Sequence, residues 1–314
     1  MKAIILTAPG PVDNLVMKDL PVPEIKPGEV LVKVKSIGIN PVDFKTRKGG
    51  GVFTYGGVSK EVQLVLGWDI SGVVTATESP LFSIGDEVFG MVNFPGIGNA
   101  YAEYVAAPAA HIVLKPANLS HEEAAAGTLA LLTAWQALVT NGNVSAGQRV
   151  LIHAASGGVG HYAVQLAKHF GAYVIGTSSA ANKDFVLSLG ADEHIDYTAQ
   201  QLADATENID FVLESLSAQT VKESIAVMRE GAKLISIVGS VSEDLKKEAA
   251  SRNISANNML VESNGEDMKA VAALLESGAI RSHVSSTFDF SEMAAVHNYL
   301  ETGRTVGKVV VNMS

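Results

Sequence analysis

The pattern of hydrophobic and polar positions changes near residue 120. Before that point, short apolar runs are separated by proline and glycine. Valine and lysine alternate over positions 32–35, with the period of two expected for a half-exposed strand. Such spacing predicts an antiparallel, barrel-like β domain, with strands in residues 2–8, 29–39, 71–77, 86–92, 100–107 and 111–116.

After residue 120, strands alternate with helices. Residues 121–142 form a helical run with Ser120 as a candidate N-cap. Several of the following strands are apolar on both faces, which is typical of a parallel sheet covered by helices. The predicted strands are 149–154, 172–177, 193–197, 210–215 and 233–240, and the predicted helices are 159–170, 181–189 and 218–229.

The last fifty or so residues return to a β-type pattern. Two helices, at 268–278 and 291–303, flank a β segment at 283–290, and the chain ends in a strand at 307–313. At 314 residues, the chain has room for two domains of ordinary size. We therefore predict an α/β protein with a Rossmann-type doubly wound parallel sheet and a second, antiparallel β-barrel domain. The predicted limits are 1–120 for the β domain, 121–265 for the sheet domain and 266–314 for the return.

The glycine-rich segment 154–160, AASGGVG, follows an apolar strand and opens an amphipathic helix. Glycines at this turn allow the backbone to approach a pyrophosphate, and the helix N-terminus favours the phosphate charge. Ala155 replaces the first glycine of the usual G-x-G-x-x-G pattern. The segment predicts a dinucleotide site at Ser156, Gly157, Gly158, Val159 and Gly160; the alternative is a strand–helix–strand unit without a ligand.

Composition excludes several classes of function. A net charge of −10 without a basic run argues against nucleic acid binding. No apolar stretch approaches the ~20 residues that span a bilayer, so no membrane association is expected. Cysteine is absent, which excludes disulfides and thiolate metal sites and is consistent with a cytoplasmic protein.

Six segments in this order resemble the medium-chain dehydrogenase/reductase superfamily, and within it the zinc-free quinone oxidoreductase (zeta-crystallin-like) branch. The resemblance covers nearly the whole chain and implies that the β domain is GroES-like. The six segments are 38–49, 66–74, 82–90, 131–138, 154–160 and 301–311.

Zinc-dependent relatives hold their metal with cysteine and histidine. This chain has Asn40 to Asp43 at the cysteine segment and Gly67-Trp68-Asp69 at the Gly-His-Glu segment. None of the eight histidines is spaced as a ligand pair, and His161 and His169 are expected at the surface of the helix 159–170. We therefore expect no metal. Reduction of a conjugated acceptor needs less charge stabilisation than alcohol oxidation, because the carbonyl delocalises the incoming charge.

The end of the second strand of the sheet domain carries no acid. An NAD enzyme has Asp or Glu there to bind the ribose 2′-hydroxyl, whereas this chain has Thr177, Ser178 and Ser179, followed by Lys183. Tyr197 matches a tyrosine that the branch places beside the adenine ribose phosphate. These residues predict NADPH as the cofactor. Helix capping by the serines and a solvated Lys183 are the alternatives.

The resemblance places the reacting centre at Asn40, Asp43 and Lys45, with the nicotinamide against Thr133. Lys45 stands where some relatives have tyrosine, so either Lys45 or water would supply the proton. Asp43 is either part of this centre or a structural carboxylate paired with Arg47 or Lys45, and Trp68 is either core or pocket wall. The resemblance implies further cofactor contacts at Leu216, Val238, Gly239, Ser240, Ser263, Asn264 and Lys308.

The predicted function is reduction of quinones or α,β-unsaturated carbonyls (enones and alkenals) by hydride transfer from NADPH. The alternatives are a 2-enoyl thioester reductase and a non-catalytic NADPH-binding protein with a structural or regulatory role. Relatives commonly pair their sheets edge to edge, so a homodimer is expected. The glycine-rich loop 48–64 is either a mobile lid or a plain surface loop.

Overall fold

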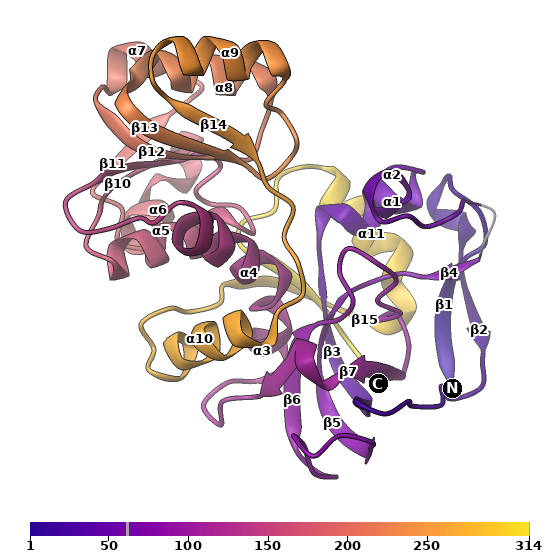
Figure 1. The fold of residues 1–314 in the computed structure, drawn as a ribbon. Coiled ribbons are helices and arrows are strands. Elements are labelled where there is room, and N and C mark those ends of the chain that lie inside the picture. The colour runs from indigo at the N-terminus through magenta and orange to yellow at the C-terminus, as the bar shows by residue number, and fades with distance from the viewer. Residues whose placement is uncertain (61–62, 314) are drawn as a thin grey trace. The chain divides into compact units, whose positions relative to one another are not determined.

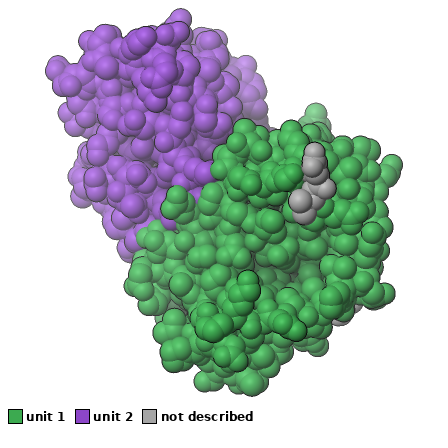
Figure 2. Space-filling view, turned by 45° about the vertical axis from the view of Figure 1, so that its right-hand side comes forward, with its two compact units in different colours: residues 1–132, 262–314 green, residues 133–261 purple. Residues whose placement is uncertain are grey.

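The structure is a computed structural model that describes residues 1–60 and 63–313. The chain forms two compact units (Figure 2). Unit 1 comprises residues 1–132 and 262–314, and unit 2 comprises residues 133–261. The loop predicted at 48–64 contains helix α2 (Val52–Tyr55), and its residues 61 and 62 lie outside the described residues.

Unit 2 is built on a six-stranded parallel sheet with the order β11-β10-β9-β12-β13-β14. In Figure 1, α5 and α6 lie on one face of this sheet, and α7, α8 and α9 lie on the other. Both faces are therefore covered, which explains the apolar strands. The strands are β9 Arg149–Ile152, β10 Tyr173–Ser178, β11 Glu193–Asp196, β12 Ile209–Glu214, β13 Met228–Ser236 and β14 Ser255–Asn258; the helices are α5 Gly160–His169, α6 Lys183–Ser188, α7 Leu202–Ala205, α8 Ala218–Val227 and α9 Glu243–Ser251.

Unit 1 contains a seven-stranded sheet of mainly antiparallel strands in the order β15-β16-β3-β5-β6-β8, with β7 also paired to β3. A second sheet has the order β2-β1-β4. The strands are β1 Lys2–Leu6, β2 Leu15–Asp19, β3 Glu29–Ile39, β4 Leu64–Val65, β5 Asp69–Thr77, β6 Glu87–Met91, β7 Tyr104–Pro108, β8 Ile112–Leu114, β15 Val284–Asp289 and β16 Lys308–Asn312.

The end of the chain returns to the N-terminal sheet. Strand β16 pairs antiparallel with β3, with Val309 opposite Ile39 and Val311 opposite Ile37, and all four side chains are buried. Figure 1 shows these yellow and indigo segments together. The other helices of this unit are α1 Pro41–Arg47, α3 His121–Ala126, α10 Gly265–Glu276 and α11 Met293–Glu301.

The helical run predicted at 121–142 is interrupted. Helix α3 ends before Gly127, α4 (Leu129–Trp135) begins two residues later, and a π-helix covers Gln136–Asn141. The break occurs because the Leu129 amide donates to Asp69 Oδ1 at 3.0 Å, so a carboxylate from β5 caps the second helix. The boundary between the two units falls within α4, between residues 132 and 133. No helix in the described part of the chain is long and apolar enough to cross a bilayer.

Candidate active site

The phosphate loop lies between β9 and α5. A Cβ on Gly160 would lie 2.1 Å from the Ala154 carbonyl oxygen, so only glycine fits where the helix begins. Ala154 has a φ of 48°, a costly conformation for a residue with a side chain. The amides of Gly158 and Val159 make no hydrogen bond within the described residues. A strained, glycine-dependent loop with open amides suits a pyrophosphate group.

The other predicted cofactor residues of unit 2 follow the carboxyl ends of parallel strands. The strand order reverses between β9 and β12, which marks the ligand crevice of open α/β sheets. Leu216 follows β12 and is 51% exposed, and Val238 follows β13 and is 40% exposed. Gly239 has a φ of 73°, and the Ser240 hydroxyl lies 2.8 Å from that of Ser236.

The residues predicted to bind the 2′-phosphate lie at the ends of β10 and β11. Ser178 is buried, and its hydroxyl lies 2.7 Å from His194 Nε2. Ser179 is half-buried, while Lys183 and Tyr197 are exposed. Neither the Lys183 ammonium nor the Tyr197 hydroxyl has a hydrogen-bond or ion-pair partner among the described residues. A cation and a hydroxyl are thus left open beside Ser178.

A buried polar cluster that was not predicted from the sequence lies next to the carboxyl end of β10. His153 lies between the hydroxyls of Thr177 (3.2 Å) and Ser224 (2.8 Å). Burial lowers the pKa of His153 to about 4, so the ring is neutral at neutral pH. Glu214 accepts the Leu216 and Ser217 amides at 2.5 and 3.0 Å and thereby shapes the turn after β12. Because its partner is the buried His153, the Thr177 hydroxyl points into the core of unit 2.

Ser156 also has a partner within unit 2, because its hydroxyl accepts from Asn182 Nδ2 at 3.1 Å. The expected surface position of His161 is wrong. His161 is fully buried, and its Nδ1 lies 3.0 Å from the Gly157 carbonyl oxygen, so the ring braces the loop. His169, at the end of α5, is exposed as expected.

The candidate catalytic residues of unit 1 lie in a buried charged cluster. Asn40, at the end of β3, donates from Nδ2 to Asp69 Oδ2 at 2.7 Å. The Lys308 ammonium donates to the Asn40 side-chain oxygen and to the Ile39 carbonyl at 2.9 Å, and lies 3.8 Å from Asp69. All three side chains are at most 3% exposed. Lys308, predicted to contact the cofactor, thus has its ammonium within this cluster.

Asp43 is fully buried in the first turn of α1. Its Oδ2 accepts the Asn40 amide at 2.7 Å, and its Oδ1 has no hydrogen-bond partner in the described part of the chain. The pKa of Asp43 is raised to about 7, chiefly by burial and in smaller part by nearby Asp69, against the lowering effects of the Asn40 amide, Tyr101 and Lys308. Asp43 can therefore hold a proton near neutral pH.

The alternative partners of Asp43 are not found. Arg47 forms an ion pair with Glu301 and donates from Nε to His297 Nδ1 at 3.2 Å, and His297 Nε2 lies 3.0 Å from the Tyr101 hydroxyl. Lys45 is exposed on α1, which suits a group that meets substrate or solvent.

Two further side chains from the sequence analysis are buried. Trp68 is 1% exposed and donates from Nε1 to the Gly96 carbonyl at 2.8 Å. The indole also packs edge-on against Phe94, so Trp68 belongs to the core of unit 1. Thr133 is 5% exposed in α4.

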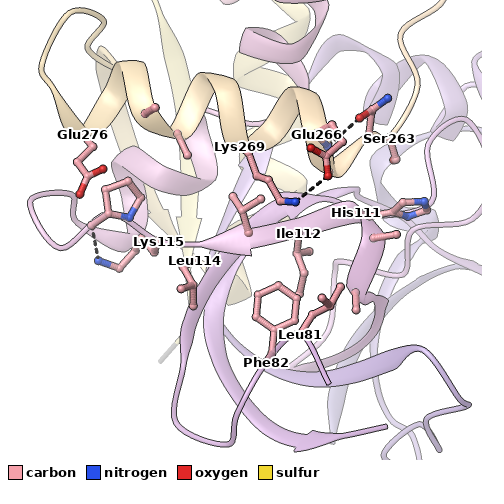
Figure 3. Close-up of a pocket in the computed structure, with 18 of the residues that line it drawn as sticks. Leu81, Phe82, His111, Ile112, Leu114, Lys115, Ser263, Glu266, Lys269 and Glu276 are labelled. Carbon is pink, nitrogen blue, oxygen red and sulfur yellow. Dashed lines mark hydrogen bonds and ion pairs between the residues drawn. The ribbon is translucent and has the colours of Figure 1, made fainter. Parts of the chain in front are cut away.

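Ser263 and Asn264 line a groove of about 890 Å³ in unit 1, between α10 and β8 (Figure 3). Ser263 Oγ accepts the Phe94 amide at 2.8 Å, and Asn264 caps α10. In Figure 3, Lys269 points from α10 to Glu266, 2.6 Å away, above a largely apolar floor. None of Asn40, Asp43, Lys45 and Lys308 lines this groove.

The residues at the zinc-ligand segments do not fit a zinc ion. Asn40 and Asp69 already bind the Lys308 ammonium, and a second cation there would meet that charge. Among the described residues, no three His, Cys, Asp or Glu side chains come together as a metal site would require.

Comparison with known proteins identifies the family. Two family models match the chain, "Alcohol dehydrogenase GroES-like domain" over residues 26–117 and "Zinc-binding dehydrogenase" over residues 189–311. The tomato (Solanum lycopersicum) 2-methylene-furan-3-one reductase is 35% identical over 99% of this chain and 79% of its own length. The chloroplastic NADPH-dependent alkenal/one oxidoreductase of Arabidopsis thaliana is 34% identical over the same shares.

A solved structure agrees with these relatives. The quinone oxidoreductase from Coxiella burnetii superposes with a TM-score of 0.94 at 35% identity, over 100% of this chain and 99% of that one. The chain belongs to the quinone oxidoreductase branch of the medium-chain dehydrogenase/reductase superfamily. This membership confirms the predicted fold class, the predicted enzyme class and a nicotinamide dinucleotide as cofactor. The individual site residues stay predictions.

Gly160→Ala tests the phosphate loop. The new Cβ would displace the Ala154 carbonyl, so we expect NADPH affinity to fall by about tenfold or more, equivalent to about 1.4 kcal/mol. Calorimetric titration measures the affinity. Ala167→Gly, in the same helix, is the matched control, because it costs about 1 kcal/mol of stability without moving the loop. Equal NADPH affinity in the two variants would contradict the role given to Gly160.

Asp43→Asn tests the buried carboxyl. Because the folded protein holds the Asp43 proton up to about pH 7 and the unfolded chain releases it near 3.8, Asp43 makes the free energy of unfolding fall as pH rises through this window. We expect Asp43 to contribute a fall of about 2–4 kcal/mol, which Asp43→Asn lacks and the surface control Asp13→Asn keeps; the raised pKa of buried Asp69 acts in the same direction in every variant.

Urea unfolding from pH 4 to pH 8 measures this difference. His153 and His297, whose pKa values burial lowers to about 4, change stability in the opposite direction over part of this window. They are present in every variant, so the comparison removes their effect. Parallel curves for wild type and Asp43→Asn would show that Asp43 ionises normally.

Proposed function

We propose that this oxidoreductase reduces enones, alkenals or quinones with NADPH and without a metal ion. The observation that carries the choice of NADPH is the open edge of unit 2, where Lys183 and Tyr197 have no partner among the described residues near Ser178 while the phosphate loop offers free amides. Asp196, an acid at this edge, accepts two hydrogen bonds from Thr198. The names of the tomato, Arabidopsis and Coxiella relatives support the substrate class.

The cofactor, when bound, supplies a hydride to the conjugated acceptor. The protein binds the phosphates, offers no fitting site for a zinc ion, and stabilises the substrate oxygen that gains charge. Asn40 Nδ2 carries a second hydrogen beyond the one donated to Asp69, and Lys45 is the exposed cation on the next helix. We assign charge stabilisation to these two donors, with the proton coming from Lys45 or water.

We also propose a homodimer, located in the cytoplasm. The edge strand β14 pairs with β13 on one side, and the other side of an edge strand is available for pairing with a second copy. Its polar sequence, Ser255–Asn258, suits pairing that relies on main-chain hydrogen bonds.

The loss of NADPH absorbance, followed with a quinone, an enone and a 2-enoyl thioester, tests the function. We expect turnover with the quinone or the enone. Turnover confined to the thioester would instead support an enoyl thioester reductase. Tight NADPH binding without turnover on any acceptor would support a non-catalytic role.

Lys183→Ala tests the cofactor preference. Loss of an unpaired cation beside a 2′-phosphate removes a charge-assisted contact, so the KM for NADPH should rise about tenfold, with little change for NADH. Lys247→Ala, an exposed lysine of α9, is the control. Equal rises for the two nicotinamides would contradict a 2′-phosphate site at Lys183.

A further inference from the structure

His194 of β11 lies inside the proposed 2′-phosphate site. Strand register places it beside Gly176 of β10. A Cβ on Gly176 would point at Val186 of α6, 2.6 Å away, and at Ala155 of the phosphate loop, 2.8 Å away. Because residues opposite each other in neighbouring strands share a face, His194 lies on the face that carries α6 and the phosphate loop.

The hydrogen bonds of His194 determine which ring nitrogen carries a proton. Nε2 lies 2.7 Å from Ser178 Oγ, and this hydroxyl also lies 3.1 Å from the Ser179 carbonyl oxygen. A serine hydroxyl has one hydrogen to donate. When it bonds to Ser179, His194 must donate from Nε2, and protonation of the ring then occurs at Nδ1 without disturbing the bond.

Burial and the charges around His194 together lower its pKa in the free protein. Partial burial lowers its pKa, Asp196 of the same strand raises it, and Lys183 of α6 lowers it. Strand β10 contributes the uncharged Ser178, while Glu193 of β11 accepts the Tyr173 hydroxyl at 2.5 Å. Lys183 therefore acts on the same ring that Ser178 holds.

We propose that His194 is a specificity-determining residue for the cofactor, whose protonated ring, oriented by Ser178, joins Lys183 in binding the 2′-phosphate of NADPH. This inference rests on the proposed preference for NADPH. A phosphate dianion beside the ring favours the imidazolium form, so binding takes up a proton. NADH lacks this phosphate and gains nothing from the charge.

The affinity of this site for a 2′-phosphate depends on pH through His194. Binding of the phosphate raises the His194 pKa above its value in the free protein, so the contribution of His194 to affinity grows as pH falls from about 8 to about 6. The phosphate itself becomes protonated near pH 6, which weakens binding. The effect of His194 is therefore measured as the ratio of affinities between wild type and His194→Gln.

The test is calorimetric titration of the full chain with 2′,5′-ADP and with 5′-ADP, at pH 8 and pH 6, in buffers of different ionisation enthalpy. For 2′,5′-ADP, we expect the wild-type advantage over His194→Gln to grow about three- to tenfold on acidification, with additional proton uptake. His169→Gln, an exposed histidine of α5, should match wild type. Binding of 5′-ADP should be alike in all three proteins and shows that each is folded.

Two results would overturn the inference, and they differ. If 2′,5′-ADP binds more tightly than 5′-ADP but the wild-type advantage does not change with pH, His194 has no such role and the NADPH preference stands. If 5′-ADP binds as tightly as 2′,5′-ADP, the proposed preference fails and the inference fails with it.

Discussion

The buried pair of Lys308 and Asp69 is the interaction on which unit 1 depends. Lys308 begins the last strand, Asp69 begins β5, and Asn40 follows β3 and caps α1, so three separate segments meet at one ammonium. A buried charge that loses its partner costs several kcal/mol. The same carboxylate also caps α4 through the Leu129 amide. One charged contact therefore connects β16 to β5 and to the residue after β3, and its carboxylate also begins α4.

Unit 2 depends on a different constraint, the close approach of backbone to backbone at Gly160. The left-handed conformation of Ala154 and the packing of Gly160 against its carbonyl leave no room for a side chain. His161 supports the turn from within through the Gly157 carbonyl. The buried stripe of α5 and the apolar strand before the loop hold it in this strained conformation. Surrounding packing commonly does this at functional sites.

Local patterns predicted most of the fold. The helix after the glycine loop was predictable because its apolar spacing and its closing glycine are local features, and the return of the last strand was predictable from its composition. The break at Gly127 was not, because the capping carboxylate of Asp69 comes from 60 residues away. His161 was misplaced because its partner, a backbone carbonyl, leaves no trace in side-chain periodicity. The resemblance indicated Asn40 and Asp43, but the depth of their burial and the partner of Arg47 are tertiary facts.

The distribution of hydrogen-bond partners separates the structural polar residues from those available to a ligand. Thr177 and Ser156 have hydrogen-bond partners within unit 2, although both belong to the predicted cofactor set, and Glu214 Oε1 accepts the amides of the turn after β12. Groups without a partner among the described residues, the Lys183 ammonium and the Tyr197 hydroxyl, follow the ends of β10 and β11. Buried polar groups rarely go unpaired, whereas binding sites keep donors open. Ser156 and Thr177, although they belong to the predicted cofactor set, therefore support the structure of the site. Lys183 and Tyr197, whose polar groups have no partner among the described residues, are the ones that would recognise the cofactor.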